Sequence, residues 1–487
     1  MADDDEEELP LIPADEFEEA DVLEIDIDEE VDEPGAHVNT IALGQGERRT
    51  SRTSLRQPRR QSHTEVTFNV QLPVAHSYLG EDLEELHGRT IHDDDSCQSI
   101  PIIGLPGVIL IPGQTLPLHV FAQSTVNMIK RILELDKTFG LVCLSYNEST
   151  YDEIHAKIGT TAEILSIKEE NDDRSGISSI RMIAAGRQRF QILDTRRQVD
   201  GTLLAKVKIL AEKSLPDFLE GARCRSQRTL KEPVWPVPVQ FDDLQFNAAF
   251  YRHKVFLIFV VYVTHEKIFS LGAAYTTWWP PWVYENYDVD CLMKKMKDEF
   301  SSWSDTFEPD KMPSDAVEFS FWVAGNIMMD DNLKLKLLAI DSAVQRLRCE
   351  LAIMQKCSVL CCRDCGEMIF NKNEVFTMSV QGPMGTYVNP GGYVHEMFTV
   401  SSERKEFALN LRGRPSSQHS WFPGYAWTIA ECKNCSDHMG WRFTVVNKKQ
   451  GLKPEMFWGI CRSAVIPKLQ QEFEDSDDEM DDWEPCV

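Results

Sequence analysis

Two Cys-x-x-Cys pairs are the residues whose type and spacing most directly indicate chemistry in this sequence. Cys362 and Cys365 form the first pair, in CCRDCGE, and Cys432 and Cys435 form the second, in ECKNCSDHMG. Each pair can present two thiolates to one tetrahedral ion, and four sulfur ligands favour zinc over calcium or magnesium. A site closed by four cysteines leaves no coordination position for water, so we expect one structural Zn²⁺ ion and no metal catalysis.

The gap between the pairs distinguishes this site from a short zinc finger. The pairs are separated by 66 residues, so the metal would join the two ends of a substantial β-domain, and Gly366 permits the tight turn of the first pair. A thioredoxin-like redox pair, or cysteines without a shared role, are the alternatives. Cys357, Cys361 and Cys461 have no partner at this spacing and are interpreted as buried thiols.

Tryptophans gather in the same part of the chain. Trp421 and Trp427 flank the Pro423-Gly424 turn in HSWFPGYAWTIA, and Trp441 follows the second cysteine pair in HMGWRF. Three indoles can then meet beside the metal, close to His419, Tyr425 and Phe443. Such an aromatic box suits a flat, uncharged ring or a modified residue, whereas packing in an ordinary core is the alternative. No residue of this set stands in the context of a nucleophile and its base, which favours binding without catalysis.

The segment before these residues is predicted to be a mixed β-sheet domain with a helix, at about 97–212. From Ile100 onward, short apolar runs broken by Gly and Pro predict strands joined by tight turns, and alternation in 162–167 and 180–184 predicts further strands. Residues 125–137 place four apolar side chains on one helical face.

A helical section follows the β-domain. Apolar residues recur at helical spacing in 288–303. Asp330 or Asp331 can begin a second, single long helix, whose apolar stripe runs from Leu333 to Met354. Such a stripe normally packs in a core; a groove for a partner is the alternative.

The charge of the chain is concentrated at its two ends. Residues 1–33 hold 18 acidic residues and no basic one, and residues 472–487 hold nine more, which accounts for most of the net charge of −28 over 487 residues. This excess of negative charge argues against binding to nucleic acid or anionic membranes. The run Val255–Val263 is about half of what a membrane span needs. The first residues lack the features of a signal peptide, so we expect an intracellular protein with a disordered tail at 1–65.

A series of segments that begins at about Ser77 is distinctive in its order: HSYLGEDLEELHGRTIHDDDSCQ, IPGQTLPL, GTTAEI, GRQRF, SAVQRLRCELAIM, YVNPGGYVHE, RPSSQHSWFPGYAWT and GWRF. In this order the segments resemble the cereblon family, the substrate receptors of cullin-4 ubiquitin ligases. Residues 100–190 also resemble the N-terminal domain of Lon proteases. No Walker A motif follows, so Lon-like proteolysis is not expected.

The resemblance implies a multidomain α+β chain. Its segments would be a disordered acidic and then Arg/Ser-rich tail (1–65), a Lon-N-like mixed β-domain (66–212), a helical adaptor-docking insertion (213–330), a long helix completing the Lon-N-like region (331–356), an all-β, zinc-bound CULT or thalidomide-binding domain (357–469), and an acidic tail (470–487).

The resemblance also implies a ligand and partners. In that family a glutarimide ring, or a C-terminal cyclic imide of a substrate protein, sits in a cage of three tryptophans. The implied ligand-binding residues here are Asn389, His419, Trp421, Trp427, Trp441 and Phe443. The implied partners are the damaged-DNA-binding protein 1 adaptor, the cullin-4 ligase core and substrate proteins, in the cytoplasm and nucleus, with no direct nucleic acid and no membrane span.

The sequence departs from the family at several points, and two other functions compete. Residues 254–264 have no counterpart in the family, which puts adaptor docking in question. Gly391 replaces a bulkier residue, which predicts a more mobile loop, and Ile429 is placed to influence which proteins fit. A methionine sulfoxide reductase B-like enzyme would need a reactive cysteine, and 419–429 contains none. A nucleoside-binding module would need a basic track that this chain lacks.

Overall fold

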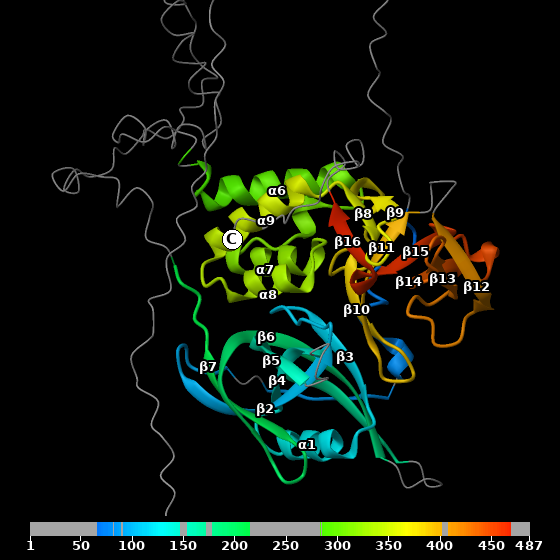
Figure 1. Ribbon diagram of the computed structural model, residues 1–487. Coiled ribbons are helices and arrows are strands. Elements are labelled where there is room, and N and C mark those ends of the chain that lie inside the picture. The colour runs from blue at the N-terminus through cyan, green and yellow to red at the C-terminus, as the bar shows by residue number, and fades with distance from the viewer. Residues whose placement is uncertain are drawn as a thin grey trace, which may run out of the picture. The chain divides into compact units, whose positions relative to one another are not determined.

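The computed structural model describes residues 66–80, 82–88, 91–146, 153–171, 178–214, 283, 285–401 and 408–468 (Figure 1). The acidic tails and the apolar segment 254–264 lie outside the described residues, as does most of 213–282. No helix within the described ranges is both long and apolar enough to cross a membrane.

The first part of the described chain is a seven-stranded sheet. Its strands are β1 (Glu84–Glu85), β2 (Cys97–Pro106), β3 (Thr115–Val120), β4 (Thr138–Tyr146), β5 (Glu153–Asn171), β6 (Ser178–Arg197) and β7 (Leu203–Ile209). They pair in the order β1-β5-β4-β2-β7-β6-β3, and β5 also pairs with β6, so five strands close into a ring. The β2–β4 pair is parallel and the other pairs are antiparallel. The predicted mixed β-sheet is confirmed.

The helix that follows β3 packs on this sheet. Helix α1 (Gln123–Leu133) buries Val126, Ile129 and Ile132 in the apolar core, as the spacing predicted. It ends four residues before the predicted end, because Lys137 takes a left-handed φ of 57° and donates its N–H to the Ile132 carbonyl at 3.0 Å. That hydrogen bond satisfies one carbonyl that the helix end leaves free.

Four further helices pack together between the two sheet regions of the sequence. They are α6 (Val289–Trp303), α7 (Ala316–Asn326), α8 (Asp331–Ala339) and α9 (Ala343–Lys356) (Figure 1). Asp288, Asp315 and Asp330 begin α6, α7 and α8, and each carboxylate accepts N–H groups of the first turn. The predictions of a helix in 288–303 and of a start at Asp330 are confirmed.

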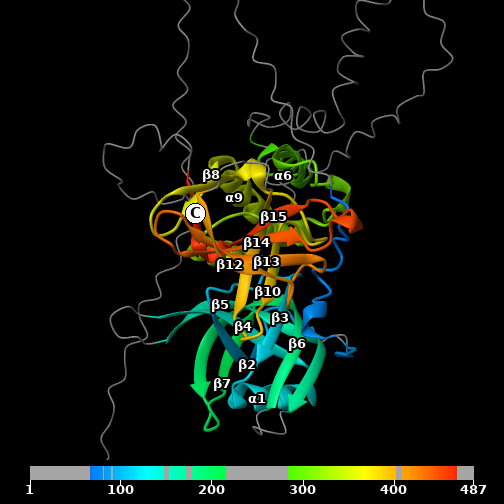
Figure 2. The same cartoon turned by 90° about the vertical axis from the view of Figure 1, so that its right-hand side faces the viewer.

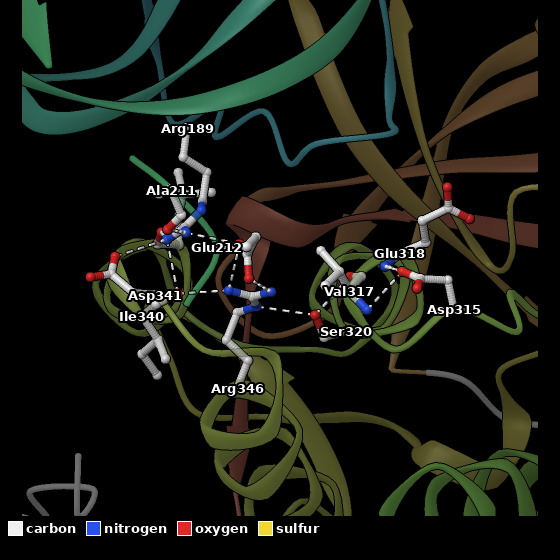
Figure 3. Close-up of polar contacts among 11 residues, drawn as sticks. Arg189, Ala211, Glu212, Asp315, Val317, Glu318, Ser320, Ile340, Asp341 and Arg346 are labelled. Carbon is white, nitrogen blue, oxygen red and sulfur yellow. Dashed lines mark hydrogen bonds and ion pairs between the residues drawn. The ribbon is translucent and has the colours of Figure 1, made fainter. Parts of the chain in front are cut away.

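The single long helix predicted from Asp330 to Met354 is wrong, because the chain leaves the helix at Ile340 and starts again at Ala343. The Ile340 carbonyl, freed by this break, accepts from Arg189 at 2.8 Å and from Arg346 at 2.6 Å. Figure 3 shows both guanidinium groups converging here, with Glu212 between them. Buried guanidinium groups need hydrogen-bond acceptors. In an unbroken helix the Ile340 carbonyl would instead accept an N–H of the next helical turn.

The C-terminal part consists of two antiparallel sheets. The larger is ordered β10 (Met384–Val388), β11 (Val394–Ser401), β15 (Met456–Cys461), β14 (His438–Val445), β13 (Tyr425–Cys432) and β12 (Leu409–Ser416), as Figure 2 shows in part. The smaller is ordered β16 (Val465–Lys468), β8 (Val359–Cys362) and β9 (Met368–Asn371). This bears out a β-rich C-terminal fold.

A buried group of charges joins these parts. Glu396 on β11 accepts from Lys334 of α8 at 2.6 Å and from Arg462 at 2.7 Å. Arg462 also pairs with Asp331 and donates to the Gly107 carbonyl, beyond β2, at 2.8 Å. The attraction of the two cations holds the pKa of Glu396 below its usual value despite the opposing effect of burial. Helix, first sheet and C-terminal sheet therefore share one ionic network.

Candidate functional site

The four cysteines of the two Cys-x-x-Cys pairs lie together in the structure. Their sulfur atoms are all within 4.8 Å of one another. The shortest cross-pair separations are 3.6 Å between Cys362 and Cys435 and 3.5 Å between Cys365 and Cys432. Cys362 ends β8 and Cys432 ends β13, so the cluster connects the small sheet to the large one. Four convergent thiols can hold one soft metal ion.

Both Cys-x-x-Cys turns of this cluster are closed by the same kind of backbone hydrogen bond. Gly366 donates its N–H to the Cys362 carbonyl at 3.0 Å, and Ser436 donates to the Cys432 carbonyl at 2.9 Å. Gly366 has a φ of 75° and Ser436 a φ of 65°. The glycine was expected from the sequence, whereas the left-handed serine was not, because residues other than glycine adopt this conformation rarely.

The thiols of the cluster differ in acidity. Burial raises the pKa of Cys362 to about 12 and also raises that of Cys432, while the backbone N–H of Glu367 is the main cause that lowers the pKa of Cys365 to about 7. A metal that binds here therefore displaces protons from the buried thiols.

An aromatic cluster lies on the large sheet. The rings of Trp421 and Trp441 meet edge to face, with centroids 4.7 Å apart and an interplanar angle of 78°. The Tyr387 ring also stacks on Trp421, with centroids 5.0 Å apart and an interplanar angle of 15°. Trp427 and Trp441 are partly buried against the same apolar core, to which Phe443 belongs. The structure thus gathers all three tryptophans in one region.

Two indole N–H groups are already occupied within the protein. Trp421 donates to the Val388 carbonyl at 3.1 Å, and Trp427 donates to the Gln418 carbonyl at 2.8 Å. These bonds fix the ring planes. Among the described residues, the main-chain groups of His419 and Trp421 have no hydrogen-bond partner. They remain available to a ligand with both a donor and an acceptor.

His419 and Asn389 occupy the two loops beside these rings. His419 is exposed, with a left-handed φ of 53°. Asn389 lies in the turn between β10 and β11, where its side chain accepts the N–H of Tyr393 at 2.9 Å. The amide oxygen of Asn389 therefore shapes the turn itself.

Comparison with known proteins gives the chain a family. The model of the ATP-dependent protease La (LON) substrate-binding domain matches residues 99–356. Protein cereblon of Xenopus tropicalis is 44% identical over 412 residues, which is 83% of this chain and 86% of that protein. The chain belongs to the cereblon family. Protein cereblon of Danio rerio is 44% identical, and the match covers 83% of this chain and 89% of that protein. Protein cereblon of Gallus gallus is 42% identical, and the match covers 83% of this chain and 86% of that protein.

The Lon-like match covers the first sheet except β1 and the first residues of β2, and it includes the described helices α6 to α9. Residues 99–356 run from β2 to the end of α9 and so end just before the cysteine and tryptophan sites. Among solved structures, a Lon N-terminal domain protein from Xanthomonas campestris is 15% identical, covers 52% of this chain and 98% of its own, and has a TM-score of 0.26. Both candidate sites of this cereblon-family chain therefore lie outside the Lon-like segment.

Two histidines of this cereblon-family chain lie next to the aromatic cluster, and the sequence did not predict them as site residues. The His395 ring lies 5.1 Å from Trp441 and 5.9 Å from Trp421, and the His438 ring lies 4.8 Å from Trp441. Burial lowers the pKa of His395 to about 4, so it is neutral at pH 7. The motif YVHE contained His395, but only the pairing of distant strands brings it to the rings.

The loop of Asn389 in this cereblon-family chain also contacts the first sheet. A β-carbon on Gly392, at a φ of 84°, would lie 2.7 Å from the carbonyl oxygen of His119. A β-carbon on Gly391 would meet Asn389 and Tyr393 at ordinary contact distances. Gly392 is therefore required by its close packing against β3. At Gly391, by contrast, a side chain would fit.

Proposed function

We propose that this protein is a substrate receptor of a cullin-4 ubiquitin ligase that binds cyclic imides in its tryptophan cluster. The observation that carries the proposal is identity of 42–44% to cereblon proteins over 83% of this chain. Without that kinship, the aromatic cluster would suggest only a site for a flat ring.

The cage recognises its ligand by shape and by two main-chain groups. A glutarimide is small, uncharged and nearly flat, so it can leave water for an aromatic surface at little cost. Its N–H and carbonyl complement the available main-chain groups of His419 and Trp421. Because the indole N–H groups of Trp421 and Trp427 are held by Val388 and Gln418, the rings are preorganised walls. A C-terminal cyclic imide on a protein would present the same ring.

Zinc is the metal we assign to the cysteine cluster. Sulfur ligands and tetrahedral closure favour Zn²⁺, with Cys362, Cys365, Cys432 and Cys435 as its ligands. Cys362, Cys365, Cys432 and Cys435 would hold the ion between the two sheets and would leave no vacant position for a substrate. The role of the ion is therefore structural.

The proposed receptor is not an enzyme. Cys357 and Cys461 are buried thiols whose pKa values burial raises to about 11 and about 12, so neither is a thiolate nucleophile at pH 7. A methionine sulfoxide reductase mechanism would need such a thiolate beside the aromatic cluster. Binding followed by presentation to a ligase needs none.

Binding is tested by titrating the full chain with glutarimide while recording tryptophan fluorescence. We expect saturable quenching that is lost in Trp427→Ala and kept in Trp303→Phe, a buried tryptophan on α6. Turnover of methionine sulfoxide without any response to imides would overturn the proposal.

Adaptor docking needs a separate experiment, because 254–264 lies outside the described residues. The full chain should retain damaged-DNA-binding protein 1 in a pull-down, and a variant lacking 254–264 should retain it at least equally. If the full chain bound the imide but did not retain the adaptor, the proposed membership of a cullin-4 ligase would be wrong, while the proposed imide binding would stand.

A further inference from the structure

A cavity lies in the Lon-like sheet, far along the chain from the tryptophans. It has a volume of about 240 Å³ and is formed by β2, α1, β4, β5, the end of β6 and the start of β7. Figures 1 and 2 both show α1 beside the β6–β7 turn, and residues of both line this cavity. The volume is enough for a terminal residue of a peptide and too small for most drug-sized ligands.

The cavity exposes more polar than apolar surface, and three of its apolar lining side chains are nearly buried. Ile102, Met128 and Leu144 line it and are 4%, 4% and 8% exposed. Arg197 and Glu153 stand at the mouth, 61% and 45% exposed, and form an ion pair at 3.0 Å. A ligand would therefore place an apolar group inward and a charged group outward.

The polar side is rich in hydrogen-bond donors. The Arg197–Glu153 pair uses one of the N–H groups of the guanidinium, which carries five. The hydroxyls of Ser124 and Thr125 and the imidazole of His155 line the same cavity. Among the described residues, Glu153 is the only carboxylate that lines the cavity, and it is already paired with Arg197. A ligand group that accepts hydrogen bonds is therefore favoured here. A planar carboxylate matches the guanidinium fork.

Two glycines keep the cavity open. A β-carbon on Gly104 would lie 3.3 Å from Nε2 of His155 and would push the imidazole aside. Gly201, at a φ of 86°, faces Ser124, and a β-carbon there would lie 3.6 Å from its side chain. Larger residues at either position would narrow the space between α1 and the sheet.

We propose that this cavity binds the free carboxyl terminus of a peptide that ends in a small apolar residue. The terminal side chain lies on Ile102, Met128 and Leu144, and the carboxylate accepts from Arg197 and the hydroxyls of the first turn of α1. Glu153 orients Arg197 and accepts the N–H of the terminal residue. This site is separate from the imide site and could hold a substrate protein by its C-terminus.

The experiment uses the full chain with ¹³C-labelled methionine methyl groups, and the probe is N-acetyl-Gly-Gly-Val with a free carboxylate. The Met128 signal, assigned through Met128→Leu, should shift saturably. The C-terminal amide of the same peptide, and the variant Arg197→Gln, should each weaken binding by about ten-fold or more.

The matched control is Lys130→Gln, which removes an exposed ion pair with Glu169 on the same helix but does not line the cavity. It should leave the affinity for the peptide unchanged, and glutarimide should not compete. Equal binding of acid and amide, an equal shift with sodium acetate, or no Met128 shift at about 10 mM peptide would each overturn the proposal.

Discussion

Trp421 and Trp441 meet edge to face, although 19 residues, the second cysteine pair among them, lie between them in the chain. Trp421 belongs to the loop before β13, whereas Trp441 lies within β14. The pairing of β13 with β14 places Ile429 opposite Trp441 and Trp427 opposite Phe443. The sheet therefore holds one wall of the cluster, and a loop supplies the other.

The first prediction concerns that wall. Trp441→Ala should weaken glutarimide binding by about ten-fold or more, because it removes the ring that packs against Trp421. Isothermal titration calorimetry measures the change. Leu411→Ala, an exposed residue of β12 on the same sheet, should bind as the unmodified protein does. Unchanged affinity in Trp441→Ala would place the imide elsewhere.

The second prediction concerns the buried ionic network. Glu396→Gln leaves Lys334 and Arg462 without their shared carboxylate, so we expect the free energy of unfolding in urea to fall by about 3–5 kcal/mol. Glu455→Gln breaks the exposed pair with Lys448 and should change it by less than about 0.5 kcal/mol.

Acid should weaken the same network. The pKa of Glu396 is lower in the folded protein than in the unfolded chain, so its contribution is complete above the unfolded pKa and is lost as pH falls through the folded one. An effect of Glu396→Gln that did not shrink on acidification would show that the charge is not what matters.

The third prediction concerns His76, whose burial lowers its pKa to about 4 from the ordinary 6.5. Below pH 6.5 the unfolded chain takes up a proton that the folded protein excludes, so stability falls from pH 6.5 to about 4. The slope is at most roughly 1.4 kcal/mol per pH unit.

The variant His76→Asn should remove that part of the slope, because asparagine tolerates the left-handed φ of 46° without titrating. Urea unfolding at a series of pH values measures it. If the free energy of unfolding depended on pH equally in the two proteins, His76 would take up a proton in the folded protein as readily as in the unfolded chain.

The fourth prediction concerns the metal. Cys432→Ser should lower the zinc content measured by plasma mass spectrometry from about one ion per chain to nearly none, since three ligands bind far more weakly than four. Cys97→Ser changes an exposed cysteine outside the cluster and should keep the ion. Acid should also release zinc, because protons compete for the thiols of Cys362 and Cys432, whose pKa values are raised.

Features encoded over a few residues were predictable from the sequence. The two Cys-x-x-Cys pairs indicated the cluster, helical spacing located α1 and α6, and Asp330 marked the start of α8. Each of these depends on side chains within one or two turns of their own backbone, so the local pattern carries the information.

Other features depended on contacts between distant residues. The Ile340 carbonyl, which the helix break leaves free, accepts a hydrogen bond from Arg189, 151 residues away. His395 reaches the tryptophans because β11 and β14 both pair with β15. Residues 102 and 203 line one cavity because β2 and β7 are neighbours. The sequence by itself determined which side chains could bind a metal or a ring. The tertiary structure decided which hydrogen-bonding groups were left for a ligand, because long-range burial selects the partner of every polar group.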